Sequence, residues 1–131
     1  MFNKKKQPPI KSLIAGGSHI EGNMTFKDGL RVDGGVTGNV RADADASSIL
    51  VISESATVIG EVTADHIIIN GSVNGPVHAR EMLELQPKAR IHGDVHYAAL
   101  EMHQGALIAG QLCPLLEEDV KPALKLAANN L

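Results

Sequence analysis

Three side chains that could bind a metal ion recur at near-regular spacing in the second half of the chain. They are His78, His96 and Cys113, separated by 18 and 17 residues. Two imidazoles and a thiolate are ligands that Zn²⁺ accepts, but a zinc site needs them to converge to bonds of about 2.0–2.3 Å. Side chains on neighbouring parallel strands stand about 4.8 Å apart and do not converge unless they lean together. We therefore interpret the three residues as a solvent-facing ladder, and we expect neither a metal nor another cofactor.

The remaining polar residues do not form a catalytic pattern. Gly16-Gly17-Ser18 lacks the lysine and the strand-to-helix context of a phosphate-binding Walker loop. No Ser/His/Asp cluster is evident either. Glu84 and Glu101 are expected to stack on a charged outer surface, with Lys88 and Arg90 nearby in the sequence to offset their repulsion. These observations favour a protein that is not an enzyme.

The element that must position all of these residues is a seven-residue pattern that occurs six times, here called the glycine phrase. It reads small, any, aliphatic, any, Gly, any, aliphatic, and its copies begin at Ser18, Gly34, Ala56, Gly71, Ala89 and Ala106. The central glycines follow one another at steps of 16, 22, 15, 18 and 17 residues. This length is too short for a helical-hairpin repeat and is typical of one coil of a β-solenoid. The step of 22 residues predicts a bulged coil around residues 41–46.

A second apolar strand precedes each of the five phrases from the second copy on. These strands are Leu30–Val32, Leu50–Ile52, Ile67–Ile69, Leu83–Leu85 and Leu100–Met102. Alternation with period two places their outer residues inside and the middle residue outside. The middle residues Val51 and Ile68 are apolar, which indicates a lateral contact. Each phrase glycine is expected at a corner, where positive φ costs it little.

The sequence thus predicts an all-β protein: a single right-handed parallel β-helix of about six coils over residues 17–112, with short flexible tails at 1–16 and 113–131. The first tail is basic, and the second is either disordered or a short helix. The irregular steps favour this fold over a left-handed hexapeptide solenoid, which repeats strictly every six residues. The latter remains as the alternative, a trimeric acyltransferase with His66 or His78 as its base. Only 2% of the residues are aromatic, as suits a narrow core of stacked aliphatic side chains.

Composition limits the partners and the compartment. A net charge of −3 gives no global nucleic-acid signature, so we expect no nucleic acid to bind. A lone cysteine suits a reducing compartment. No apolar run reaches the roughly 18 residues of a spanning helix, and no signal peptide is evident. We therefore predict a cytoplasmic protein.

Self-assembly is predicted from the two ends of the solenoid. An open coil leaves strand edges and core side chains uncovered, and solenoids that stay monomeric carry polar caps. The expected apolar residues at the two ends are Ile20, Met24 and Phe26 on the first coil and Leu100, Met102, Ile108 and Leu112 on the last. We expect these residues to form the polymerisation interface; a monomeric adaptor capped by its own tails is the other possibility.

The first six residues predict a weak membrane anchor. Met1 and Phe2 can enter the headgroup region, and Lys4, Lys5 and Lys6 can attract anionic lipid at about 1 kcal/mol each. In a filament many such anchors act together. The predicted partners are therefore other copies of the chain and anionic lipid.

The glycine phrases, the intervening Leu-x-Val strands and the Met-Phe-x-Lys start resemble the bactofilins, a bacterial polymer-forming cytoskeletal family. The resemblance covers about residues 12–112 and the first six residues. It implies a right-handed β-helix that forms non-polar filaments without nucleotide, joined head to head and tail to tail. It also implies peripheral association with the inner membrane and scaffolding of cell-shape, envelope or peptidoglycan-remodelling proteins.

Overall fold

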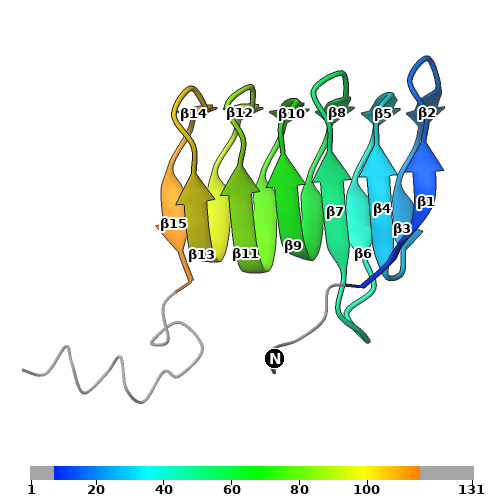
Figure 1. Cartoon of the computed structure of the whole chain (residues 1–131), viewed down its shortest axis with the longest axis horizontal. Coiled ribbons are helices and arrows are strands. Elements are labelled where there is room, and N and C mark those ends of the chain that lie inside the picture. Colours follow the sequence, from blue (N-terminus) through cyan, green and yellow to red (C-terminus); the bar gives the residue numbers. More distant parts are fainter. Residues whose placement is uncertain (1–7, 116–131) are drawn as a thin grey trace, which may run out of the picture.

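A computed structural model describes residues 8–115, which form fifteen β-strands (Figure 1). Every strand pairing among them is parallel. The strands are β1 (Ile10–Ile14), β2 (His19–Glu21), β3 (Met24–Phe26), β4 (Gly29–Val32), β5 (Gly35–Thr37), β6 (Val40–Ala42), β7 (Ile49–Ile52), β8 (Thr57–Ile59), β9 (Val62–Ile69), β10 (Ser72–Asn74), β11 (Val77–Leu85), β12 (Arg90–His92), β13 (Val95–Met102), β14 (Leu107–Ala109) and β15 (Leu112–Pro114). The all-β solenoid of six coils is confirmed.

Each coil has three sides, so the solenoid has three faces. The first face consists of β1, β4, β7 and the C-terminal halves of β9, β11 and β13. The second face is a separate six-stranded sheet in the order β2, β5, β8, β10, β12 and β14. The third face consists of β3, β6, the N-terminal halves of β9, β11 and β13, and β15. Because β9, β11 and β13 run through the corner between the third and first faces, their hydrogen bonds join these two faces into one nine-stranded sheet.

The phrase glycines form a column at the corner between the second and third faces. Gly38, Gly60, Gly75 and Gly93 all have φ between 147° and 154°, a region that side chains rarely adopt. A Cβ atom at any of them would lie 2.1–2.4 Å from the carbonyl oxygen of the phrase glycine one coil before. Glycine is therefore required at this corner for two reasons: the backbone has a φ angle that other residues rarely adopt, and the neighbouring coil approaches too closely for a Cβ atom.

The core is a narrow tube of stacked aliphatic side chains. Leu30, Leu50, Ile67 and Leu83 occupy one register position on successive coils and are each at most 1% exposed. On the third face the register position of Ala42, Ala64 and Ala79 carries a large aromatic residue near each end. These two residues are Phe26 and Tyr97. This register position is therefore filled by small side chains in the middle of the solenoid and by one aromatic ring near each end.

The solenoid extends beyond the bounds predicted from the sequence. Strand β1 lies within the segment 1–16 that was assigned to a tail, and it pairs with β4 through a register shift between Ile10 and Ser12. At the other end β15 continues to Pro114. The first coil therefore consists of β1, β2 and β3, and the sixth of the C-terminal half of β13 with β14 and β15.

The bulged coil predicted from the long glycine step is confirmed between β6 and β7. Residues 43–48 connect these two strands as turns and irregular chain. Ser48, which is 2% exposed, fixes the end of the bulge to the next coil. Its Oγ accepts a hydrogen bond from the Asp65 backbone N–H at 2.9 Å, and its own N–H donates to Asp65 Oδ2 at 3.1 Å. The extra residues thus leave the solenoid and return to it in register.

Candidate assembly surfaces

The N-terminal end of the described solenoid is formed by β1, β2 and β3, each of which pairs on one side only. Of the three residues predicted here, Ile20 and Met24 are half-buried and pack against the core. Phe26 differs from the prediction, because it is only 7% exposed. It lies beside Ala42 in register, and that small side chain leaves room for the ring inside the tube.

Sequence reasoning missed two apolar residues at this end. Ile10 and Leu13 in β1 are 45% and 59% exposed. They were hidden because lysine and proline neighbours made residues 8–16 look like a tail, although Ile10, Leu13 and Ile14 already gave an apolar signal. The first coil therefore exposes more apolar surface than the sequence indicated.

The C-terminal end agrees more closely with the predicted set. Leu100 and Ile108 are half-buried and pack against the core, while Met102 and Leu112 are 45% and 50% exposed. These four residues lie on β13, β14 and β15, the three strands of the sixth coil. Within the described chain no further coil covers them. This surface therefore leaves both core side chains and strand edges uncovered. Their role as an interface remains a prediction.

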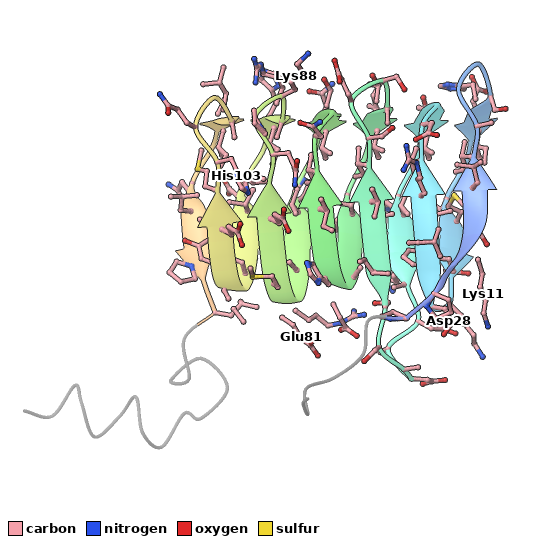
Figure 2. All side chains as sticks on the ribbon, in the orientation of Figure 1. Lys11, Asp28, Glu81, Lys88 and His103 are labelled. Carbon is pink, nitrogen blue, oxygen red and sulfur yellow. The ribbon has the colours of Figure 1, made fainter. Side chains whose placement is uncertain are left out.

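The proposed membrane residues Met1, Phe2, Lys4, Lys5 and Lys6 lie outside the described residues. The next lysine, Lys11, is in β1 and forms an ion pair with Asp28 at 3.0 Å (Figure 2). No helix that could cross a bilayer occurs within residues 8–115.

The ladder of potential metal ligands exists on the third face. His78 pairs in register with His96, and His96 pairs with Cys113. The two imidazole rings are stacked with centroids 4.4 Å apart and planes 9° from parallel, whereas ligands of one ion would point at a common centre. His78 Nε2 instead lies 2.8 Å from Glu61 Oε2.

The environment of His78 lowers the pKa of its imidazole. Partial burial lowers the pKa of His78 below 6.5, the nearby Glu61 carboxylate raises it, and the stacked His96 lowers it. His66, the other candidate base of the acyltransferase alternative, lies on the first face in register with Ile49 and Met82. The two histidines therefore belong to different faces and do not share a site.

The acidic pair on the first face has a different partner from the one predicted. Glu84 and Glu101 are adjacent in register, as expected. Lys88 binds Glu54 at 2.7 Å, and Arg90 donates to the carbonyl oxygens of Ala89 and Gly105. His103 approaches the acids instead, with its Nε2 3.0 Å from Glu101 Oε2 and 3.7 Å from Glu84 Oε2.

Among the described residues Glu84, Glu101 and His103 are the one group of three possible metal ligands whose donor atoms lie within 4.8 Å of one another. His103 Nε2 lies within ion-pair distance of both carboxylates, and Gln86 Nε2 donates to Glu84 Oε2 at 2.5 Å. We interpret the group as a hydrogen-bonded surface cluster.

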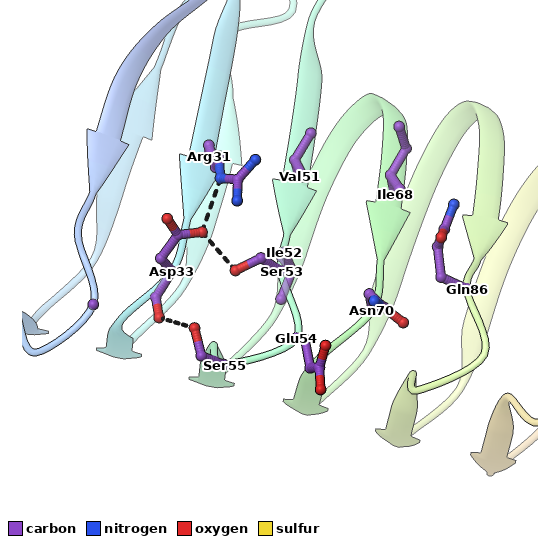
Figure 3. A pocket seen from close by; sticks show the side chains of 11 residues that line it. Arg31, Asp33, Val51, Ile52, Ser53, Glu54, Ser55, Ile68, Asn70 and Gln86 are labelled. Atoms are coloured by element: carbon purple, nitrogen blue, oxygen red, sulfur yellow. Dashed lines mark hydrogen bonds and ion pairs between the residues drawn. The ribbon is translucent and has the colours of Figure 1, made fainter.

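A shallow groove runs along the first face beside Arg31, Asp33, Val51 and Ile68 (Figure 3). At its charged end Arg31 and Ser53 both bind Asp33. Asp33 Oδ1 accepts from Arg31 Nε at 2.9 Å and from Ser53 Oγ at 2.5 Å. The hydrogen bond from Ser53, followed by that from Arg31, lowers the pKa of Asp33 below its ordinary value. The groove thus has a charged end and, beside it, the half-buried aliphatic side chains of Val51 and Ile68. Its lining residues do not include a set of acid, base and nucleophile in contact with one another.

Comparison with known proteins agrees with this geometry. Residues 12–113 match the family model described as "Bactofilin: Polymer-forming cytoskeletal". The chain is 29% identical over 93 residues to bactofilin BacP of Myxococcus xanthus (strain DK1622), which covers 71% of this chain and 37% of that relative. The alignment therefore spans little more than a third of the relative's length. No solved structure matches the chain.

Proposed function

Since the chain belongs to the bactofilin family, whose members are polymer-forming cytoskeletal proteins, we propose that it assembles end to end, without nucleotide, into non-polar filaments. The supporting observation is that both ends of the described solenoid combine edge strands with partly exposed apolar side chains. Edges of this kind pair readily with other chains unless they are covered. The ends are therefore the surfaces at which copies join.

The energetics of such a contact are favourable. An end contact that removes roughly 800 Å² of mostly apolar surface from water gains on the order of 20 kcal/mol at about 25 cal/mol per Å². Association costs about 4–15 kcal/mol in lost freedom of motion. The difference is large enough to hold a filament together.

The test is a charge placed in one end. Ile108→Arg puts a guanidinium into the half-buried C-terminal end surface, and we expect long filaments to disappear in negative stain while the circular dichroism spectrum remains β-rich. The matched control is Ile59→Arg on β8, in the middle of the second face, where the native side chain is 48% exposed. Filaments that persist in Ile108→Arg, or that vanish equally in the control, would contradict the C-terminal interface.

The same variant distinguishes non-polar from polar filaments. In a non-polar filament two different contacts alternate, N-terminal to N-terminal and C-terminal to C-terminal. Ile108→Arg then leaves dimers, and adding Met24→Arg at the other end leaves monomers. In a polar filament every contact uses both ends, so Ile108→Arg alone gives monomers. Sedimentation velocity separates the two results.

We further propose that the filaments lie on the cytoplasmic face of the inner membrane, held by Met1, Phe2, Lys4, Lys5 and Lys6, and that they scaffold envelope-remodelling proteins. A weak anchor of about 1 kcal/mol per lysine becomes effective when many copies are linked. Deleting residues 1–6 should leave filaments intact but release them from anionic liposomes in flotation, whereas neutral liposomes should bind neither form. Flotation that is unchanged by the deletion would contradict the anchor.

A further inference from the structure

One column of outward-facing residues on the first face changes its character along the rod. Each coil contributes one residue in register: Leu13, Arg31, Val51, Ile68, Glu84 and Glu101, from the first coil to the sixth. The column has a cation in the second coil, two aliphatic residues in the middle and two acids at the C-terminal end. Arg31, Val51 and Ile68 lie side by side in Figure 3.

The four middle residues of this column are complementary to themselves when the solenoid is turned around, whereas Leu13 comes opposite the partner's Glu101. We propose that the first face binds the first face of a second copy running antiparallel, about a two-fold axis between the third and fourth coils. Coil two then meets coil five, and coil three meets coil four. Val51 packs on the partner's Ile68, and Arg31 faces the partner's Glu84, each contact occurring twice.

The neighbouring column fits the same pairing. Asp33, Ser53, Asn70 and Gln86 follow one another on coils two to five, as shown by the backbone bonds from Ser53, Asn70 and Gln86 to the coil before. Turning the rod around brings Ser53 opposite the partner's Asn70 and Asp33 opposite the partner's Gln86. Each pair joins an acceptor to a side chain that can donate.

A parallel pairing is disfavoured by the same residues. It would place Arg31 beside a second Arg31 and Glu84 beside a second Glu84, and like charges that face each other across an interface are destabilising. The arginine keeps donors for the antiparallel contact. Its side chain is 51% exposed, and only its Nε binds Asp33 out of the five N–H groups of a guanidinium.

The size of the face sets the strength of the pairing. Six strands about 4.8 Å apart and four residues of about 3.3 Å each give a flat area of roughly 400 Å² per copy. A stable pair of proteins usually buries about 800 Å² per partner. Two single rods therefore pair weakly, and rods joined into filaments pair strongly because their contacts add. That gain in strength rests on the proposed polymerisation, whereas the complementarity of the face does not.

Zero-length crosslinking tests the register directly. The variant Arg31→Lys keeps the charge and supplies an amine that carbodiimide can join to a carboxylate. Positions 31 and 84 of one chain lie three coils apart, about 14 Å along the axis, which is too far for a direct bond. We expect a covalent dimer in which mass spectrometry finds positions 31 and 84 joined. The control Arg41→Lys, also in the second coil but on the third face, should give no link to position 84.

Charge reversal provides a second test of the contact between positions 31 and 84. Arg31→Glu should abolish the contact, and Arg31→Glu combined with Glu84→Lys should restore the link between positions 31 and 84. Absence of the link in both Arg31→Lys and the double variant overturns the proposal. Links within one chain from Lys4, Lys5 or Lys6 to Glu84 also overturn it, because they would mean that the chain's own N-terminal segment covers the face.

Negative stain of the same samples separates this proposal from the polymerisation. Filaments without the link contradict only the lateral pairing, and the link without filaments contradicts only the end contacts. Where both occur, Arg31→Glu should convert filaments of double width into filaments of single width.

Discussion

The glycine column at the corner predicts that the same substitution, glycine to alanine, destabilises the protein by very different amounts at two positions. Gly22 and Gly75 occupy the same phrase position and both have positive φ, 127° and 149°. An added Cβ at Gly22 meets nothing within 4 Å, because no coil precedes it at that corner. At Gly75 the same atom lies 2.3 Å from the Gly60 carbonyl oxygen and 2.6 Å from its carbon. Alanine therefore suffers backbone strain at both positions and a clash with the neighbouring coil only at Gly75.

The magnitudes follow from these two terms. A side chain held in this region of φ and ψ costs about 1–3 kcal/mol. Forcing an additional methyl group into packed backbone costs about 1–3 kcal/mol more. We expect Gly22→Ala to lower the free energy of unfolding by about 1–3 kcal/mol and Gly75→Ala by about 2–6 kcal/mol.

Urea unfolding followed by circular dichroism measures the difference, with both substitutions made in Ile108→Arg to prevent long filaments. Protein concentration is held constant, since association changes apparent stability. Any remaining contact between N-terminal ends would add to the cost of Gly22→Ala and so works against the expected order. Equal losses of stability in the two variants would refute the argument that the neighbouring coil leaves no room for a Cβ atom at Gly75.

Two further predictions concern single side chains. Ser48→Ala should lower the free energy of unfolding by about 1–3 kcal/mol, because it leaves the partly buried N–H of Asp65 without its acceptor. Ser47→Ala next to it should change the stability in urea by less than about 0.5 kcal/mol, and equal effects would contradict this role of the Ser48 hydroxyl. For His78, whose pKa in the folded chain is below 6.5, the unfolded state binds more protons as the pH falls below 6.5, so this residue lowers stability in that range. Glu61→Gln should lower the pKa of His78 further in an NMR titration of Ile108→Arg, since it removes the anion that raises it; an unchanged or raised pKa would contradict that role of Glu61.

The sequence alone was sufficient for the repeat and for most of the register. Period-two alternation decides which residues point inward, and the phrase glycines mark the corners, so the column from Arg31 to Glu101 and the ladder of His78, His96 and Cys113 could be aligned without coordinates. Both signals are local, because they depend on the backbone conformation of a few consecutive residues. The irregular step after Gly38 likewise identified the bulged coil.

The tertiary structure decided what depends on neighbours distant in sequence. Strand β1 has no phrase of its own before it and becomes a strand because β4 offers a partner edge. The burial of Phe26 depends on the space beside Ala42, and the partner of Glu101 depends on which turn brings His103 near. Packing and ion pairing are set by distance in space, and only the stacking of the coils fixes that distance.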